Sequence, residues 1–409
     1  MKARKKPRQT TKWLYGLPFI SGIVYRFTSG MIVLLMATIW RGRFINREKL
    51  PKEEPYLLLP NHTSMLDPFW AGACLGRGVR AMASSSLLNT PFLGAYLKMC
   101  GCFPKMKYTK DKGSMETLQR LYEDGYVILV FPEGNRCWNG ETAPIGAGIG
   151  RLIKRLNCKV VYARLNTAYL IKPRWARYSR SLPVEVEYDG PYTYDESLSA
   201  EDILADVQEK LTVTPGLSAP GKVKGKKMAV GLPNYLWACP NCFSMDTLAV
   251  EGKAKNHVAC SSCESTWELD VFSILHGEED WSVADAFRRI ENHFGMPPIA
   301  SSDRFESEKI ALENVNTKLL FIPRGKNKPE VRAEGALQIH QDGLRIMDGE
   351  EQIWQAGFKD ILGISMEFGN LLHFRVDGEL FRLDLGQDSP PKWDHFLRKW
   401  RMHTVGAEH

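Results

Sequence analysis

Between residues 50 and 212, short apolar runs alternate with helical patterns, and this alternation restricts the chain to few folds. Apolar runs of four to six residues are typical of buried strands, and apolar residues spaced three and four apart are typical of helices. The alternation predicts an α/β domain whose sheet is covered by helices. Strands are expected at Tyr56–Leu59, Val79–Ala83, Tyr126–Phe131, Val160–Leu165 and Val184–Tyr188, and helices at Pro68–Leu75, Leu87–Met99, Lys112–Glu123, Ile149–Leu156 and Ala200–Leu211.

Two of the expected strands end in loops that carry titratable side chains. The segment NHTSMLD at 61–67 places His62 five positions before Asp67, and the segment FPEGNR at 131–136 contains Glu133 and Arg136. In open α/β sheets, ligands bind in the crevice beyond the carboxyl ends of the strands. Both loops are therefore expected to face a single site.

The residue types in these loops favour acid–base chemistry on a phosphorylated substrate. A carboxylate near a histidine holds the imidazole in the tautomer whose other nitrogen accepts a proton, so His62 and Asp67 are a candidate base and its orienting group. Arg136 offers a fork of donors suited to phosphate, and Glu133 can accept hydrogen bonds from hydroxyl groups. No Ser or Cys nucleophile is evident, which favours direct attack by a substrate hydroxyl. The alternative is structural, because Asp67-Pro68 is also a good helix start.

Together the two segments resemble the signature blocks of the glycerolipid acyltransferase family, the lysophosphatidate acyltransferases in particular, whose motifs read NHxxxxD and FPEGTR. The resemblance runs from about residue 17 to 212. It implies that His62 deprotonates the acceptor hydroxyl, that Asp67 orients His62, and that Glu133, Gly134 and Arg136 hold the glycerol phosphate. It also implies a coenzyme A or acyl carrier protein thioester as the acyl donor, and lysophosphatidate or a related lysophospholipid as the acceptor.

The third family block, a glycine followed six positions on by arginine, is matched loosely. Gly101 is followed by Lys107, with Lys105 close by, so both lysines are candidate phosphate contacts that present a point charge in place of a bidentate fork. Asn135 and Cys137 stand where the family usually has Thr and Ser. These departures leave the acceptor lipid open.

The N-terminal segment favours a membrane surface. Residues 1–47 hold ten Lys or Arg and no Asp or Glu, so the rest of the chain carries a net charge of −3. A basic leader on a nearly neutral protein fits anionic lipids and disfavours nucleic acid. Two apolar pieces, 13–25 and 27–40, are each too short to span a bilayer. We predict a monotopic helical hairpin on the cytoplasmic face of a membrane, with a single-pass helix or buried core helices as alternatives.

Four of the nine cysteines form two CxxC pairs, Cys239 with Cys242 and Cys260 with Cys263, separated by seventeen residues. Four thiolates on two tight turns are typical of a structural zinc ribbon. A pair of disulfides is the alternative, and the reducing conditions of the cytoplasm disfavour it.

The C-terminal hundred residues have a different pattern, with short strands around Asp342-Gly343 and Asp377-Gly378 and a final helix from Pro390. This pattern resembles the pleckstrin-homology-like fold, whose members bind lipids, peptides or proteins; a plain structural β domain is the alternative. The expected divisions are a basic arm and hairpin at 1–48, an acyltransferase domain at 49–213, a basic linker at 214–233, the zinc ribbon at 234–272, a helical connector at 273–305 and the β-rich module at 306–409.

Two functions from different classes fit these features. The first is a membrane-associated acyltransferase that acts on a lysophospholipid. The second is a catalytically inactive lipid-binding or scaffolding protein that holds a partner through its ribbon and C-terminal module. The presence of His62, Asp67, Glu133 and Arg136 together favours the enzyme, because a decayed site would usually have lost at least one of them.

Overall fold

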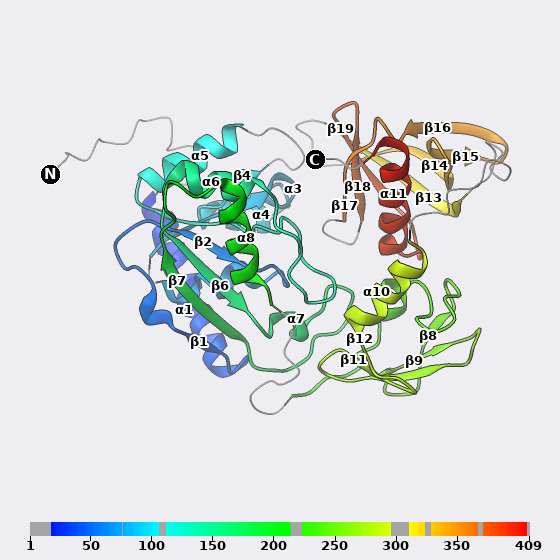
Figure 1. Ribbon diagram of the computed structural model, residues 1–409, viewed down its shortest axis with the longest axis horizontal. Helices are drawn as coiled ribbons and strands as arrows, with labels where there is room; N and C mark the ends of the chain where they lie inside the picture. Colours follow the sequence, from blue (N-terminus) through cyan, green and yellow to red (C-terminus); the bar gives the residue numbers. More distant parts are fainter. Residues whose placement is uncertain are drawn as a thin grey trace. The chain divides into compact units, whose positions relative to one another are not determined.

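The computed structural model describes residues 18–75, 77–105, 112–213, 223–295, 311–323, 329–366 and 371–406. The chain divides into two compact units. The first consists of residues 1–228 with 270–273, and the second of residues 229–269 with 274–409. Figure 1 shows the elements of both units.

The first unit is built on a seven-stranded sheet with the order β1-β7-β6-β2-β5-β3-β4. The pairs from β6 through β2, β5 and β3 to β4 are parallel, whereas β7 runs antiparallel to β6, and β1 is parallel to β7. The strands are β1 (Arg43–Ile45), β2 (Leu57–Pro60), β3 (Val79–Ser84), β4 (Phe103–Lys105), β5 (Val127–Leu129), β6 (Val160–Leu165) and β7 (Glu185–Tyr192). The predicted α/β sheet is therefore present.

Helices cover both faces of this sheet, and its central strands are apolar on both sides for that reason. Leu57 and Leu59 pack toward α5, α6 and α8, whereas Leu58 lies in the core that includes α1 and α2. Figure 1 shows α6 and α8 in front of the sheet and α1 behind it. The helices are α1 (Pro18–Thr38), η2 (Arg47–Lys49), α2 (Asp67–Gly72), η3 (Ala73–Leu75), α3 (Ser85–Leu88), α4 (Leu93–Met99), α5 (Lys112–Glu123), α6 (Gly148–Leu156), α7 (Ala168–Ile171) and α8 (Ala200–Leu211).

The predicted helical hairpin is wrong for the part that the structure describes. A single helix, α1, runs from Pro18 to Thr38 and passes through Arg26 without interruption. Proline is tolerated in the first turn of a helix, and Arg26 is exposed, so neither residue breaks α1. Residues 1–17 lie outside the described part. Among the helices that are described, none combines the length and the hydropathy that crossing a bilayer requires.

The helix expected at Leu87–Met99 is also wrong as one element, because it divides into α3 and α4. Pro91 lies at the break, where its ring removes a backbone donor and restricts the residue before it. Phe92 follows with a positive φ of 57°. By contrast, Ala200–Leu211 forms as expected, and its first turn has a capping box between Ser199 and Asp202.

In its described residues, the second unit contains two antiparallel sheets and three helices. A five-stranded sheet has the order β12-β11-β10-β9-β8, and a seven-stranded sheet has the order β16-β15-β14-β13-β19-β18-β17. The strands are β8 (Leu248–Glu251), β9 (His257–Cys260), β10 (Thr266–Leu269), β11 (Ile274–His276), β12 (Trp281–Ser282), β13 (Leu312–Ile322), β14 (Glu330–Ile339), β15 (Gly343–Asp348), β16 (Glu351–Gly357), β17 (Leu362–Met366), β18 (Leu372–Val376) and β19 (Glu379–Asp384). The helices are α9 (Leu232–Tyr235), α10 (Val283–His293) and α11 (Pro390–Val405).

The final helix α11 completes the core of the seven-stranded sheet. Ser389 caps it by accepting a hydrogen bond from the backbone N–H of Lys392, and prolines occupy its first positions. Trp393, Leu397 and Trp400 are buried in the cluster formed by the strands. One face of α11 therefore closes the sheet, as its apolar spacing in the sequence indicates.

Candidate active site

The candidate site lies at the carboxyl ends of two neighbouring strands. His62 follows β2 and Glu133 follows β5, and the two strands pair in parallel through Leu58 and Leu129. Asn61 fastens the first loop to the sheet because its Oδ1 accepts a hydrogen bond of 2.7 Å from the backbone N–H of Leu165 at the end of β6. Three adjacent strands therefore position the loop that carries His62.

Asp67 organises the His62 loop from a buried position. One carboxylate oxygen, Oδ2, lies 3.0 Å from Nδ1 of His62, and it also accepts the backbone N–H groups of Thr63 at 2.6 Å and Ser64 at 2.7 Å. The side chain is fully buried. Although Asp67 begins α2, its carboxylate makes no capping bond to that helix and turns back to the preceding loop. The helix-cap interpretation therefore does not describe what this carboxylate does.

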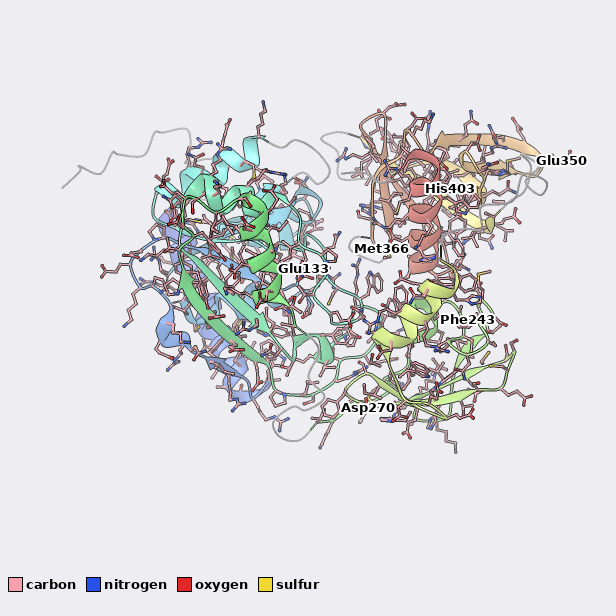
Figure 2. The ribbon with its side chains drawn as sticks, viewed as in Figure 1. Glu133, Phe243, Asp270, Glu350, Met366 and His403 are labelled. Carbon is pink, nitrogen blue, oxygen red and sulfur yellow. The ribbon has the colours of Figure 1, made fainter. Side chains whose placement is uncertain are left out.

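Glu133 joins the two loops. Its Oε1 accepts a hydrogen bond of 2.6 Å from the backbone N–H of His62, and its Oε2 accepts one of 2.9 Å from the backbone N–H of Ala143. Figure 2 labels Glu133 in the first unit. Each carboxylate oxygen is thus occupied by a backbone donor. The side chain holds the His62 loop, the FPEGNR loop and the segment after it in one arrangement.

Two further contacts hold His62. Its ring stacks on Phe131, with the ring centroids 3.9 Å apart, and its carbonyl oxygen accepts a hydrogen bond of 2.8 Å from the backbone N–H of Cys137. The side chain of His62 remains 18% exposed. The imidazole is therefore fixed in orientation and still accessible to a substrate.

Arg136 is half-buried and is supported by a residue from another part of the chain. Nη1 of Arg174 donates a hydrogen bond of 3.1 Å to the carbonyl oxygen of Arg136. The guanidinium of Arg174 also lies over the ring of Trp138, 4.2 Å from its centroid. The hydrogen bond holds the backbone of Arg136, and the cation–π contact holds the side chain of Trp138.

The site has titratable groups whose pKa values are shifted by burial. Burial raises the pKa of Glu133 to about 8, against the effect of its two backbone hydrogen bonds, which favour the ionised form. Burial also lowers the pKa of Arg136, which the negative charge of Asp67 opposes. The thiol of Cys137 is buried and its pKa is raised, so this cysteine is a poor nucleophile.

The remaining predicted contacts are less central. Gly134 is exposed and has a φ of 71°, so the backbone of this turn favours glycine although a side chain would meet no neighbour. Lys105 ends β4 at the sheet edge, two strands away from β5. Lys107 lies outside the described residues. The fold therefore brings together His62, Asp67 and Glu133, with Arg136 on the same loop as Glu133, and places Lys105 further along the sheet.

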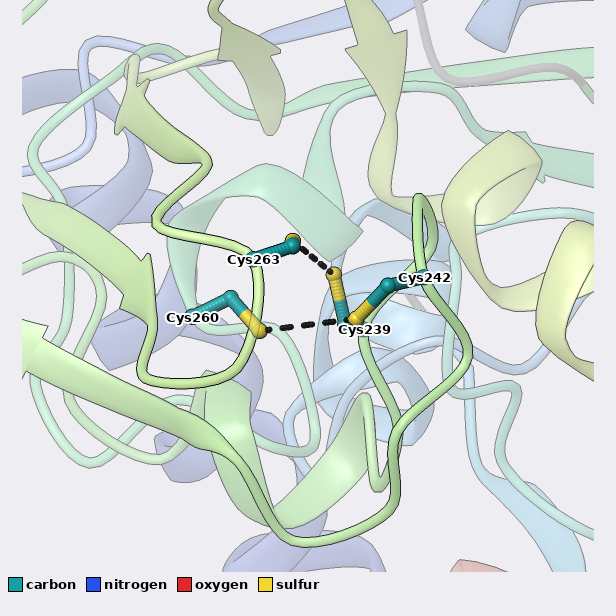
Figure 3. A group of neighbouring side chains, drawn as sticks. All are labelled: Cys239, Cys242, Cys260 and Cys263. Carbon is teal, nitrogen blue, oxygen red and sulfur yellow. Dashed lines mark hydrogen bonds between the residues drawn. The ribbon is translucent and has the colours of Figure 1, made fainter.

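A second cluster of side chains lies in the other unit. Cys239 and Cys242 precede β8, whereas Cys260 and Cys263 lie at the turn between β9 and β10. Their four sulfur atoms lie within 4.8 Å of one another (Figure 3). The two predicted knuckles therefore meet.

Several residues that shape the site escaped the sequence analysis. Asn61 stands next to His62 in the motif and was a detectable signal, but its bond to β6 depends on strand order. Arg174 and Trp138 carry no local signal, because their contacts with each other and with Arg136 join segments that are far apart in the sequence or irregular.

Comparison with known proteins finds similarity to acyltransferases. The acyltransferase family model matches residues 41–164. The 1-acyl-sn-glycerol-3-phosphate acyltransferase of Saccharomyces cerevisiae is 28% identical over 145 residues, which are 34% of this chain and 47% of that protein. The enzyme of the same name from Bacillus subtilis is 23% identical over 126 residues, 31% of this chain and 62% of that protein. The chain thus spans about half the length of these relatives.

A solved structure, the 1-acyl-sn-glycerophosphate acyltransferase of Thermotoga maritima, aligns with 46% of this chain and 76% of its own length, at 17% identity and a TM-score of 0.39. The predicted resemblance is confirmed by the family model over the segment that contains both motif loops. The match to the acyltransferase family model spans residues 41–164, and His62, Asp67, Glu133 and Arg136 all lie within it.

Proposed function

We propose that this protein transfers a fatty acyl group from an acyl thioester to the free hydroxyl of lysophosphatidate or a related lysophospholipid. The observation that carries the proposal is the bond between Asp67 and His62, with Oδ2 3.0 Å from Nδ1. This bond keeps the proton on Nδ1 and leaves Nε2 as the acceptor. The names of the curated relatives favour lysophosphatidate as the acceptor.

The reaction follows from this geometry. Nε2 of His62 takes the proton of the acceptor hydroxyl as its oxygen attacks the thioester carbonyl carbon. An ester C–O bond forms, the C–S bond breaks, and the imidazolium returns the proton to the departing thiolate. Asp67 stabilises the imidazolium through Nδ1. The raised pKa of Cys137 supports direct transfer over a thioester intermediate on the enzyme.

The acceptor phosphate is assigned to Arg136. The positive charge of a half-buried guanidinium is stabilised by an anion that binds beside it. The guanidinium can also donate hydrogen bonds to two phosphate oxygens at once. Glu133 was expected to bind substrate as well, but both of its oxygens accept backbone donors. We therefore give Glu133 a positioning role: it acts on the reaction through His62.

The test is a screen of lysophospholipids with a radiolabelled acyl thioester, using coenzyme A and carrier-protein donors and the full chain. We expect transfer to a lysophospholipid that bears a phosphate, and a loss of about 10²–10⁴-fold in the His62→Ala variant. Circular dichroism of that variant checks that the fold is intact. Absence of transfer to every acceptor, with lipid binding retained, supports the inactive scaffolding protein instead. Undiminished turnover in His62→Ala contradicts the assignment of the base.

We further propose that the first unit works at a lipid surface through α1. Thr28, Ile32 and Met36, spaced four residues apart, face the core. The opposite side, which is solvated on an ordinary surface helix, is apolar: Phe27 is 74% exposed and Leu34 is 62% exposed. Basic residues lie within α1 and on either side of it in the sequence, and a basic segment of this kind favours contact with anionic lipid. They are Arg26, Arg41 and Arg43 on the surface and the other basic residues of 1–47 in the sequence.

Flotation with vesicles that contain anionic lipid tests this surface. The double variant Phe27→Glu with Leu34→Glu is expected to lower the bound fraction at least tenfold, because each carboxylate must enter the interface. Leu198→Glu is the matched control, since Leu198 is also exposed but precedes α8. Equal binding of the double variant and the control contradicts a role for α1.

A further inference from the structure

The four cysteines in the second unit have the spacing of a metal site. The sulfur atoms of Cys239 and Cys263 are 3.7 Å apart, and so are those of Cys242 and Cys260 (Figure 3). Four thiolates around a tetrahedral zinc ion, with bonds of about 2.3 Å, have sulfur atoms about 3.8 Å apart. Two of the sulfur separations therefore match those of a tetrahedral zinc shell, and all four sulfur atoms lie within 4.8 Å of one another.

Backbone donors point at the sulfur atoms in the same way in both turns. The N–H of Asn241 donates to the sulfur of Cys239 at 3.4 Å, and the N–H of Ser262 donates to the sulfur of Cys260 at 3.4 Å. Each donor lies two residues after its cysteine, so the two turns are equivalent. Such N–H donors offset the negative charge of thiolates and orient them toward a shared cation.

Hydroxyl groups surround the same atoms. Oγ of Ser244 is 3.4 Å from the sulfur of Cys242, Oγ1 of Thr247 is 3.3 Å from that of Cys260, and Oγ of Ser265 is 3.3 Å from that of Cys263. A disulfide requires sulfur atoms about 2.05 Å apart, well below the separations found here. The arrangement therefore suits four metal-bound thiolates better than two disulfides.

The segment 239–246, which contains the first cysteine pair and is called the first cysteine turn below, also contacts α10 and α11. Nε of Arg289, on α10, donates a hydrogen bond of 3.2 Å to the carbonyl oxygen of Pro240. The ring of Phe243 stacks on that of His293, also on α10, with centroids 3.8 Å apart; Figure 2 labels Phe243. Nζ of Lys392, on α11, is 2.8 Å from Oδ2 of Asp246. These contacts connect the first cysteine turn to both helices.

The five-stranded sheet has few apolar residues of its own to hold it in place. Its buried side chains are mainly Val258, Trp267, Leu269 and Leu275. A core of this size does not stabilise a small β structure, and such structures usually depend on a metal or on disulfides. A crosslink between the two turns is therefore the expected source of order.

We propose that Cys239, Cys242, Cys260 and Cys263 hold one structural zinc ion, and that this ion keeps α10 and α11 ordered by fixing the first cysteine turn. The site has four protein ligands and no open position, so it has no part in acyl transfer. The proposal stands independently of the acyltransferase activity.

The experiment combines metal analysis with hydrogen exchange on the full chain. Elemental analysis is expected to give about one zinc per chain for the wild type, and well under half for Cys260→Ser. Hydrogen exchange followed by mass spectrometry is expected to show at least tenfold faster exchange in α10 and α11 after a chelator has removed the metal, with recovery when zinc is returned. Cys158→Ser is the matched control, because Cys158 is a free, buried cysteine of the first unit.

Three outcomes overturn the proposal. A well-protected protein without zinc, in which thiol titration finds fewer than nine free cysteines, establishes disulfides in its place. One iron per chain establishes a different metal. If zinc is present but its removal leaves exchange in α10 and α11 unchanged, the ion does not order these helices. Should Cys260→Ser fail to fold, chelation and zinc return on the wild type decide the question.

Discussion

The two clusters of functional side chains are assembled by different means. In the first unit, His62 and Glu133 are 71 positions apart and meet because β2 and β5 pair in the sheet. In the second unit, each cysteine pair sits in one tight turn, and the same N–H···S bond recurs in both turns. Long-range packing builds the candidate active site, whereas local turns build most of the cysteine cluster. Substitutions should therefore affect the two clusters separately.

Among the substitutions that test whether the two clusters are independent, Asp67→Asn is expected to have the largest effect. The amide keeps the shape of the side chain but loses the negative charge that stabilises the imidazolium and selects the tautomer of His62. We expect kcat to fall by about 10²–10⁴-fold, with the zinc content unchanged. Steady-state kinetics and elemental analysis measure the two quantities. If the variant keeps more than a tenth of the wild-type rate, Asp67 has no orienting role.

A smaller effect is expected for Glu133→Gln. Glutamine has one carbonyl oxygen to offer, so it can accept from the N–H of His62 or of Ala143 but not from both. A hydrogen bond between neutral groups is worth about 0.5–1.5 kcal/mol, so the loss of one bond corresponds to a fall of about 2–10-fold in kcat. A rise confined to KM would show instead that Glu133 binds the acceptor directly.

Arg174→Lys should act on acceptor binding. Lysine keeps the positive charge but loses the planar fork that donates to the Arg136 carbonyl and lies over Trp138. We expect KM for a phosphate-bearing acceptor to rise about 3–10-fold, with kcat within twofold of the wild type. Arg177→Lys, at an exposed position three residues further on, is the control. Equal kinetics in the two variants would show that Arg174 does not affect acceptor binding.

The smallest effect is a pH dependence of stability. Glu133 keeps its proton in the folded protein up to about pH 8, whereas an unfolded chain loses it near pH 4.5. Between these values the folded state binds more protons, so raising the pH favours unfolding. The melting temperature of the wild type should fall relative to that of Glu133→Gln between pH 5 and pH 8. A parallel pH course for both proteins would show that Glu133 is ionised throughout.

The local parts of this fold could be predicted from the sequence. The strand at 160–165 and the helices at 112–123 and 200–211 form where the periodicity indicates. The errors arise where periodicity and breakers compete. Arg26 does not interrupt α1, because an exposed arginine fits a helix, whereas Pro91 divides α3 from α4.

The candidate site also has a part that local sequence signals predict and a part that they do not. His62 with Asp67 was predictable, because five residues of chain keep the two side chains near each other. The use of Glu133 as a clamp was not, since its partners are the backbone N–H groups of His62 and Ala143, and no side-chain pattern reports a backbone donor. Arg174 was not predictable either, because it lies ten positions beyond the segment that the family model matches.

The sequence by itself determined the chemical groups of both clusters, and it determined the spacing of the cysteine pairs, because a few residues of chain leave two thiols little freedom. Only the tertiary structure decided which side chains and backbone groups contact one another. The order of the strands sets His62 against Glu133, and the packing of α10 and α11 against the first cysteine turn gives that turn its partners. These contacts join residues tens to more than a hundred positions apart, and the free energy that fixes them comes from the buried cores rather than from local preference.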